Sequence, residues 1–189
     1  MNRRKLRSVT MVAAAWLGLQ AAAHAAPVGR LALEDVLGEA VSLPCAGQQL
    51  KATVLFFMSK RSKDESAAFA RAVDEKLLNG PVQSVGIVDL RRYGGIWRGL
   101  AMSRLRKSAS DGRDHRRERR VARGIDASPE VVNRWHLIGD FDGSIFERFG
   151  VEREPARPIA FVLDRAGELR GPYSELTGLF DAVARALAD

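Results

Sequence analysis

A short polar segment between an apolar run and a helix carries the side chains of this chain that are best placed for chemistry. Thr53–Met58 is a continuous apolar run of strand length, and Ser59–Ser66 follows it with hydroxyl, cationic and carboxylate side chains. Many α/β domains place reactive groups at such a junction, because the N-terminus of a helix favours negative charge. The junction contains neither cysteine nor histidine. Chemistry by a thiolate is therefore excluded at this position.

Cys45 is the only cysteine among the 189 residues, and it precedes the apolar run. A single thiol cannot close a disulfide within the chain. We interpret Cys45 as a structural thiol that contributes no chemistry. The alternative is an exposed Cys45 that reacts with an external thiol.

The sequence predicts no metal and no cofactor. His115 and His136 are the only histidines after residue 25, and neither has a neighbour at metal-ligand spacing. Asp140 and Asp142 precede Gly143 as in part of a calcium loop, but the later acidic ligands are missing. The chain also contains no phosphate-binding loop and no nucleophile elbow.

Residues 1–25 have the pattern of a signal peptide. Four basic residues within the first seven are followed by an uncharged, mostly apolar stretch and by Ala23-His24-Ala25, a small-x-small cleavage site. We expect cleavage after Ala25, which leaves one domain of 164 residues, 26–189, in the periplasm or outside the cell. Cleavage also lowers the formal charge from +7 to +3. An uncleaved anchor is the alternative.

A strand, a helix and a second strand are predicted in the first half of the chain. The helix is expected over Ser62–Leu78, and Val82–Leu90 has the apolar pattern of the second strand. The two strands should be parallel with a right-handed crossover. Ser62 and Glu65 have the spacing of a capping box, in which each side chain bonds a backbone N–H at the helix start.

The C-terminal part predicts a return to alternating strands and helices. We expect a strand over 135–139, a short helix near 145–149, a strand over 159–163, a hairpin turn at 164–167, a returning strand over 168–170 and a helix over 176–187.

Four segments in this order resemble the thioredoxin-like fold in its TlpA or redoxin branch: Val54–Phe57, Ser62–Leu78, Asp142–Val151 and Arg157–Asp164. The resemblance implies an α/β domain with a central mixed sheet flanked by helices, followed by a C-terminal β-hairpin and helix. It also implies a thiol-disulfide oxidoreductase or peroxidase as the family activity.

The chain departs from the family at the redox site. The Cys-x-x-Cys pair of the family falls on Ser62-Lys63-Asp64-Glu65, so both cysteines are missing. A serine hydroxyl keeps its proton at neutral pH and cannot form a disulfide. No catalytic residue is therefore expected, and Ser62 and Glu65 keep only a capping role. The polar segment also resembles that of the cysteine-less YtfJ-like periplasmic proteins.

The resemblance assigns Pro158 to the cis-proline of the family, where extended peptides pair with the main chain. Arg157 precedes Pro158 and, with Lys60, Arg61 and Lys63, forms a candidate rim for binding anions near the helix start. The alternative is ordinary solvated surface charge, because Asp64 and Glu65 already lie at this end of the helix.

A basic insertion is predicted over about residues 91–133. Arg91–Arg123 contains twelve lysines and arginines and three acidic residues. Trp97 and Leu100 belong to an amphipathic helical stripe, whereas Ser108–Arg120 is expected to be a mobile loop or a frayed helix. The insertion could contact an anionic membrane surface or an acidic partner. The interpretation we favour is that the stripe packs on the domain and the arginines are solvated.

The sequence therefore predicts an exported, redox-inactive domain that binds an unknown peptide or protein around Pro158. Nucleic acid is not expected to be a partner of an exported chain. The alternative function is a thiol-disulfide oxidoreductase or peroxidase that uses Cys45 with an external thiol.

Overall fold

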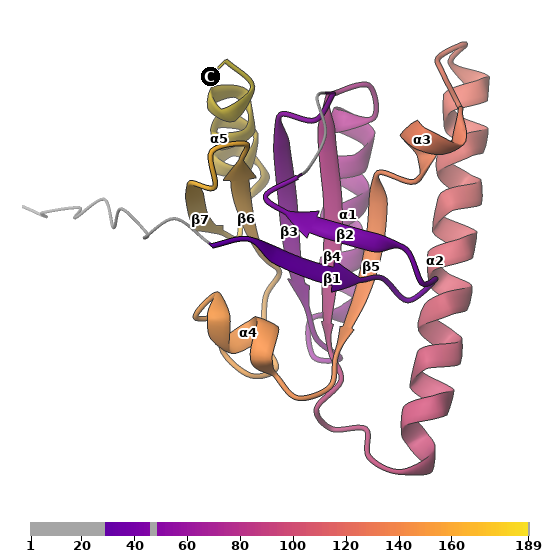
Figure 1. Cartoon of the computed structure of the whole chain (residues 1–189), viewed down its shortest axis with the longest axis vertical. Helices are drawn as coiled ribbons and strands as arrows, with labels where there is room; N and C mark the ends of the chain where they lie inside the picture. Colours follow the sequence, from indigo (N-terminus) through magenta and orange to yellow (C-terminus); the bar gives the residue numbers. More distant parts are fainter. Residues whose placement is uncertain (1–28, 46–48, 189) are drawn as a thin grey trace, which may run out of the picture.

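The computed structural model describes residues 29–45 and 49–188, so the predicted signal peptide lies outside the described residues. Among the helices of the described part, none is both long enough and apolar enough to cross a membrane. In chain order the elements are β1 (Leu31–Glu34), β2 (Ala40–Leu43), β3 (Ala52–Met58), α1 (Lys63–Leu77), β4 (Val82–Asp89), α2 (Ile96–Ala122), α3 (Pro129–Val132), β5 (Trp135–Asp140), α4 (Ser144–Arg148), β6 (Ile159–Asp164), β7 (Leu169–Tyr173) and α5 (Leu176–Ala188) (Figure 1).

A five-stranded mixed sheet in the order β5-β4-β3-β6-β7 forms the centre of the molecule. β3, β4 and β5 are parallel, and β6 and β7 are antiparallel to their neighbours. The predicted parallel pairing of β3 and β4 around α1 is confirmed. The predicted β6–β7 hairpin and the C-terminal helix are confirmed as well. β1 and β2 form a separate antiparallel hairpin.

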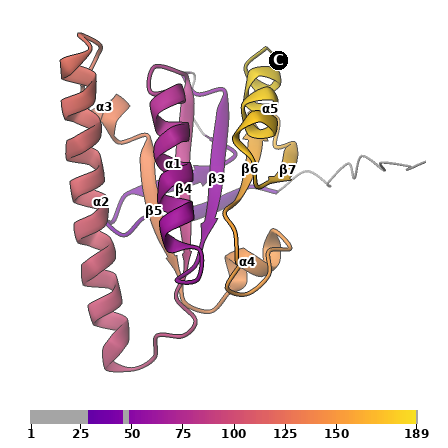
Figure 2. The same cartoon turned by 180° about the vertical axis from the view of Figure 1, so that it is seen from behind.

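The two faces of the sheet are covered differently. α1 and α5 cover one face, where Phe69, Val73 and Leu179 pack on Val54 and Phe56 of β3 (Figure 2). The β1–β2 hairpin and α4 cover the other face (Figure 1). There, aromatic side chains gather around Phe57, whose ring centroid lies 5.0 Å from that of Phe146. β3 is buried on both faces, as its uninterrupted apolar sequence predicts.

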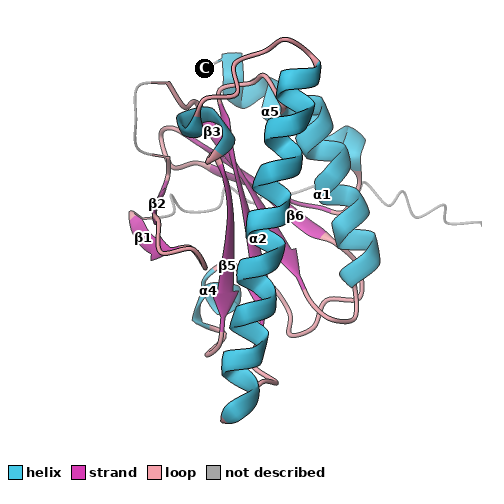
Figure 3. Ribbon diagram, turned by 90° about the vertical axis from the view of Figure 1, so that its right-hand side faces the viewer, coloured by secondary structure: helices cyan, strands magenta, loops and turns pink. Residues whose placement is uncertain are grey.

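α2 runs along β5 on the same side of the sheet as α1 (Figure 3). It is one continuous helix of 27 residues, so the prediction of a mobile loop or a frayed helix over Ser108–Arg120 is wrong. The buried positions of this half are Ala109, Arg113, Arg116 and Arg120. Their spacing of four, three and four residues is helical, but arginines occupy most of these positions. An apolar pattern therefore could not reveal the helix.

The prediction that Trp97 and Leu100 pack on the domain is also wrong. Trp97 and Leu100 are 59% and 43% exposed, and Ile96 is 85% exposed. The helix instead buries Ala101 and packs Met102 and Leu105 against β5 and its neighbours. The helix is thus attached by Met102, Leu105, small side chains and arginines, whereas the large apolar side chains Ile96, Trp97 and Leu100 face solvent.

Candidate functional site

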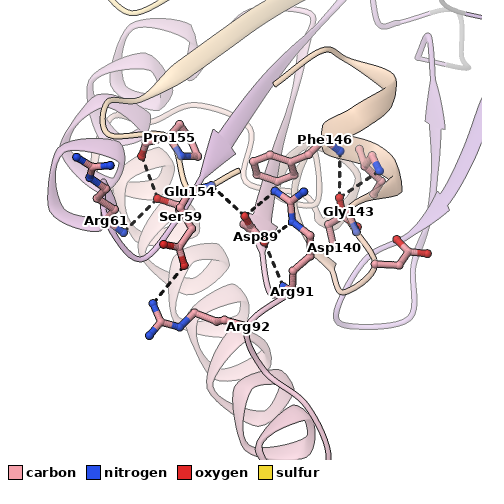
Figure 4. Close-up of polar contacts among 12 residues, drawn as sticks. Ser59, Arg61, Asp89, Arg91, Arg92, Asp140, Gly143, Phe146, Glu154 and Pro155 are labelled. Carbon is pink, nitrogen blue, oxygen red and sulfur yellow. Dashed lines mark hydrogen bonds and ion pairs between the residues drawn. The ribbon is translucent and has the colours of Figure 1, made fainter. Parts of the chain in front are cut away.

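The carboxyl ends of the three parallel strands form one edge of the sheet. In the strand register, Met58 of β3 lies beside Val88 of β4, and Asp89 of β4 lies beside Asp140 of β5. β6 begins at the same edge, because Ile159 pairs with Phe57 of β3. The loops after β3, β4 and β5 and the loop before β6 therefore meet here, as the labelled side chains of Figure 4 show. Ligands of open α/β sheets commonly bind at this edge.

Three buried serines occupy the junction of β3 and α1. The Oγ atoms of Ser59 and Ser62 are 3.3 Å apart, and Ser66 donates a hydrogen bond of 3.1 Å to Ser62 Oγ. Ser59 donates its only hydroxyl proton to the carbonyl oxygen of Pro155 at 3.0 Å. Ser62 must then donate to Ser59, because each hydroxyl carries one proton. The three hydroxyls form a chain in which every proton is engaged, and we call it the serine chain.

Ser62 is at the N-cap position of α1, but its side chain makes no capping hydrogen bond. The predicted capping box is therefore wrong. The Ser62 hydroxyl instead accepts from Ser66 and from the backbone N–H of Ser59. Glu65 is exposed, and no hydrogen bond of its side chain is found within residues 29–45 and 49–188. Glu65 thus takes part neither in capping nor in the serine chain.

The serine chain has no group that could activate a nucleophile. Activation of a serine needs a base within hydrogen-bond reach. The partners of Ser59, Ser62 and Ser66 are one another, backbone N–H groups and the Pro155 carbonyl. The Ser62 hydroxyl is therefore a buried structural group.

A buried carboxylate, Asp89, holds two loops together at this edge. Arg91 donates to it from Nε at 3.0 Å and from Nη2 at 2.8 Å, and the backbone N–H of Glu154 donates at 3.2 Å (Figure 4). Burial disfavours the charged form of Asp89, but these hydrogen bonds outweigh it and hold the pKa of Asp89 below its usual value. This pair was not predicted from the sequence, although an aspartate at the end of a buried strand was visible.

The loop before β6 is pinned at three points. Asp89 holds the Glu154 N–H, Ser59 holds the Pro155 carbonyl, and Arg92 forms an exposed ion pair with the Glu154 side chain at 3.3 Å. Glu154 adopts a φ of +49°, the only positive φ of a non-glycine residue in the described part of the chain. Such a conformation persists where the surroundings hold it, and it is frequent at ligand-binding sites.

The prediction of a cis-proline at Pro158 is wrong. The cis peptide bonds of the described residues are Leu43–Pro44 and Gly171–Pro172, so the bond between Arg157 and Pro158 is trans. Pro158 is half-buried at the start of β6, and Arg157 is exposed. Pro158 thus precedes β6 directly, but its peptide bond does not have the predicted cis geometry.

The four candidate anion-binding residues all lie on the surface at this edge. Lys60, Arg61, Lys63 and Arg157 are exposed, and none of them forms an ion pair within the described part of the chain. The exposed carboxylates of α1's first turn lie beside them in sequence. We call these four cations the cationic rim. They are free to interact with an external anionic group.

Asp140 caps the short helix α4 and does not belong to a calcium loop. Its carboxylate accepts the backbone N–H groups of Gly143 at 2.8 Å and of Phe146 at 3.0 Å. Burial and the neighbouring Asp142 carboxylate raise the pKa of Asp140. Gly143 has a φ of +87°, and a Cβ there would lie 2.6 Å from Arg91 Cδ. Glycine is therefore required where Arg91 crosses α4.

Cys45 lies at the opposite end of the sheet. It is buried, and the groups that influence its ionisation are Thr53 at the start of β3 and Asp164 and Arg165 at the end of β6. Six residues of extended strand, roughly 20 Å, separate Thr53 from Ser59. Burial raises the pKa of the Cys45 thiol and so disfavours the reactive thiolate.

A second polar cluster, not predicted from the sequence, joins α2 to the β1–β2 hairpin. Arg113 donates to Asp35 at 2.7 Å and to Glu39 at 2.6 Å, and His136 Nδ1 lies 3.0 Å from Asp35. Carboxylate and imidazole groups could ligate a metal ion, but the Arg113 guanidinium already bridges both carboxylates. Burial lowers the pKa of His136 despite the nearby Asp35. The cluster is therefore an ionic tie between elements.

Comparison with known proteins supports the fold and gives no sequence match. Neither a protein-family model nor a curated protein matches the chain. Solved structures do match. A thiol-disulfide oxidoreductase from Bacteroides fragilis matches with a TM-score of 0.54 and 12% identity, over 84% of this chain and 99% of the other. A protein described as a thioredoxin from Neisseria meningitidis gives a TM-score of 0.53 and 14% identity, over 86% and 90%.

The chain has the thioredoxin-like fold. The predicted fold class is thus confirmed, and the single cysteine agrees with the absence of a Cys-x-x-Cys pair. At this level of identity the likeness concerns the fold alone. What the thioredoxin-like scaffold does in this chain must be argued from its own residues.

Proposed function

We propose that this chain is an exported thioredoxin-like module without thiol redox chemistry, and that it binds a peptide or protein segment at the edge formed by the ends of β3, β4 and β5. The observation that carries the proposal is the serine chain. Ser59, Ser62 and Ser66 fill the start of α1 with hydroxyls that are buried and mutually bonded. Such groups contribute rigidity and no electron transfer.

The pinned loop before β6 supports binding at this edge. Ser59 and Asp89 fix the backbone of Pro155 and Glu154 from two different strand ends. A backbone segment that is already ordered loses little entropy when a partner pairs with it. This rigidity takes the place of the cis-proline geometry in our proposal. The cationic rim borders the loop and favours a partner segment that carries carboxylates.

Enzymatic assays on the purified chain test the loss of chemistry. We expect neither reduction of insulin disulfides in the presence of dithiothreitol above the uncatalysed rate nor consumption of hydrogen peroxide. Turnover that disappears in Cys45→Ser would establish the alternative, an enzyme that uses Cys45 with an external thiol. A buried Cys45 on the far end of the sheet argues against that alternative.

Site-specific crosslinking in cells tests the binding surface. A photoreactive residue at Arg157 should capture a partner, and the same residue at the exposed Arg185 of α5 serves as the control. Capture from position 157 should fall when Lys60→Glu and Lys63→Glu reverse the charge of the rim. Equal capture from both positions, or capture that ignores the rim charge, would contradict binding at this edge.

Export is tested separately on the natural chain. We expect the protein in the extracytoplasmic fraction, with an N-terminus that begins at Ala26. A chain recovered from the cytoplasm with its first 25 residues intact would remove the exported part of the proposal and leave the binding surface unaffected.

A further inference from the structure

The N-terminal tip of α2 exposes a group of large apolar side chains. Ile96, Trp97 and Leu100 are three of the five large hydrophobic residues that are exposed in the described part of the chain. Spacings of one and four residues place them on the outer side of the helix, whereas Ala101 and Leu105 face β5. We call Ile96, Trp97 and Leu100, together with Arg98 and Arg104, the α2 tip. A contiguous exposed group of this kind marks an interaction surface.

The charged residues that neighbour the tip along the chain are all positive. Residues 91–107 contain six lysines and arginines and no acidic residue. Arg98 lies over the ring of Phe141, 4.1 Å from its centroid, and Arg104 is exposed. The first acidic residue of the helix is Asp111, which lies roughly 16 Å along the axis from Leu100. A partner of the tip must therefore offer both an apolar region that can take up these side chains and negative charge beside it.

The tip is also a projecting end of a firmly held helix. α2 extends past the sheet at the end of the molecule where α4 lies (Figure 1). Its other half is fixed by buried arginines: Arg113 binds Asp35 and Glu39, and Arg120 donates to the Leu78 carbonyl at the end of α1. The apolar side chains are thus presented on a narrow, convex surface and are not covered by the domain itself.

We propose that the α2 tip docks this protein on an anionic lipid bilayer. Trp97 suits the interface between headgroups and acyl chains, Ile96 and Leu100 can enter the acyl region, and the arginines can bind lipid phosphates. A stable protein partner normally needs a complementary surface of more than about 1,000 Å² in total, which a single helix end does not offer. A deformable bilayer surface accepts such an end without a matching groove.

Docking through the tip turns the edge of the sheet that carries the serine chain towards the bilayer. The loop between β4 and α2 connects the two surfaces, because Arg92 at its start pairs with Glu154 of the pinned loop. The docking surface is distinct from the cationic rim, so the two proposals can fail independently.

Sedimentation with lipid vesicles tests the docking. The chain that begins at Ala26, as expected after export, is mixed with phosphatidylcholine vesicles that contain phosphatidylglycerol, and with vesicles of phosphatidylcholine alone. We expect binding to the anionic vesicles that weakens with salt. The combined change Ile96→Gln, Trp97→Gln and Leu100→Gln should weaken binding about tenfold or more. All variants begin at Ala26, because the basic and apolar residues before it would bind anionic vesicles by themselves and mask the effect of the tip.

Matched controls lie on the same helix. Val121 is 65% exposed at the far end of α2, and Val121→Gln should leave vesicle binding unchanged. Arg104→Gln should weaken binding about fivefold, because this is the contribution of one arginine that lies near an anionic membrane surface. The exposed Arg117 pairs with Asp114, and Arg117→Gln should have little effect.

Trp97 fluorescence provides a second measurement that does not depend on the triple variant. Its emission should shift to the blue on addition of anionic vesicles, and Trp97→Phe should remove most of the shift. Undiminished sedimentation of the triple variant, equal weakening in Val121→Gln, or equal binding to neutral vesicles overturns the proposal. Failure of the wild-type chain to bind anionic vesicles also overturns it. If the wild-type chain then binds a protein that the triple variant does not bind, the tip is assigned to that protein.

Discussion

At the scale of single residues, the site is defined by which hydrogen bonds the hydroxyls make. Ser59 alone links two backbone segments: it accepts the N–H groups of Arg61 and Ser62 and donates to Pro155, in a loop 96 residues away. Ser62, which the sequence resemblance places at the position of a reactive thiol, only supports this arrangement. The candidate site is thus rigid because its small polar side chains are saturated with partners.

Ser59→Ala should destabilise the protein by about 2 kcal/mol, because two buried backbone groups and one partly buried N–H lose their hydrogen-bond partner. Urea unfolding followed by circular dichroism measures the difference. The exposed Ser110 of α2 provides the control, and Ser110→Ala should change the free energy of unfolding by less than about 0.5 kcal/mol. Similar values for both variants would mean that the bonds of Ser59 are not made in solution.

Asp89→Asn should cost about 3 kcal/mol, since it leaves the mostly buried guanidinium of Arg91 without its counter-charge. It should also loosen the loop before β6, so amide exchange at Glu154 should become faster in the variant. The exposed Asp181 of α5 is a suitable control, and Asp181→Asn should affect neither quantity. Unchanged exchange at Glu154 in Asp89→Asn would show that Asp89 does not pin the loop.

Sequence patterns predicted the position of the site better than its contacts. The junction at Ser59–Ser66 follows β3 and precedes α1 as predicted, because apolar strands and helix starts have local signatures. The partners of Ser59 and Asp89 come from a distant loop, and no local pattern specifies such contacts. Ser62 illustrates the limit: its place at the N-cap was predicted, whereas its bonding was not.

At the scale of elements, α2 is the unusual feature of this molecule. Its inner face uses arginines that bond to the β1–β2 hairpin and to α1, through Arg113 to Asp35 and through Arg116 and Arg119 to Asp74. The hairpin turn also reaches the outer edge of β5, where Val36 donates to Leu137. The arginine positions follow helical spacing, but a pattern based on apolar residues assigns them to solvent. Charge-rich helices of this type are therefore easily predicted as loops.

The tie between α2, β5 and the hairpin should make stability depend on pH. Burial keeps the pKa of His136 below its unfolded value, so the unfolded chain binds a proton more readily than the folded one. The neutral His136 contributes its full stabilisation of the fold at a pH above the unfolded pKa of histidine. This stabilisation is lost as the pH falls through the unfolded pKa towards the folded pKa. We expect the free energy of unfolding to decrease between about pH 7.5 and pH 5.5.

His136→Gln should flatten this dependence, because a neutral amide replaces the titrating imidazole beside Asp35. His115 is exposed on α2, and His115→Gln should leave the slope unchanged. Denaturant unfolding at a series of pH values measures both variants. A wild-type slope that survives in His136→Gln would assign the pH dependence to other groups.

At the scale of the whole molecule, the two ends of the sheet have different chemistry. One end gathers the serine chain, the pinned loop, the cationic rim and the α2 tip (Figure 1). The other end holds Cys45, buried near Thr53 and Asp164. The overall order of strands and helices was predictable because a buried parallel unit and a C-terminal hairpin leave clear patterns. The separation of the thiol from the site follows from that same topology, since Cys45 precedes β3 and the site follows it.

The thiol of Cys45 should be protected in the folded protein. Burial both blocks access and raises the pKa of the thiol, so reaction with a maleimide at pH 7 requires an opening of the structure. We expect labelling of the native chain to be slower than labelling in urea by at least about a hundredfold. Ser110→Cys in a Cys45→Ser background places the only thiol on the exposed face of α2 and should react at the rate of an unfolded chain. If native Cys45 reacted as fast as this control, the thiol would be accessible, and redox chemistry with an external thiol would again be the better account of the molecule.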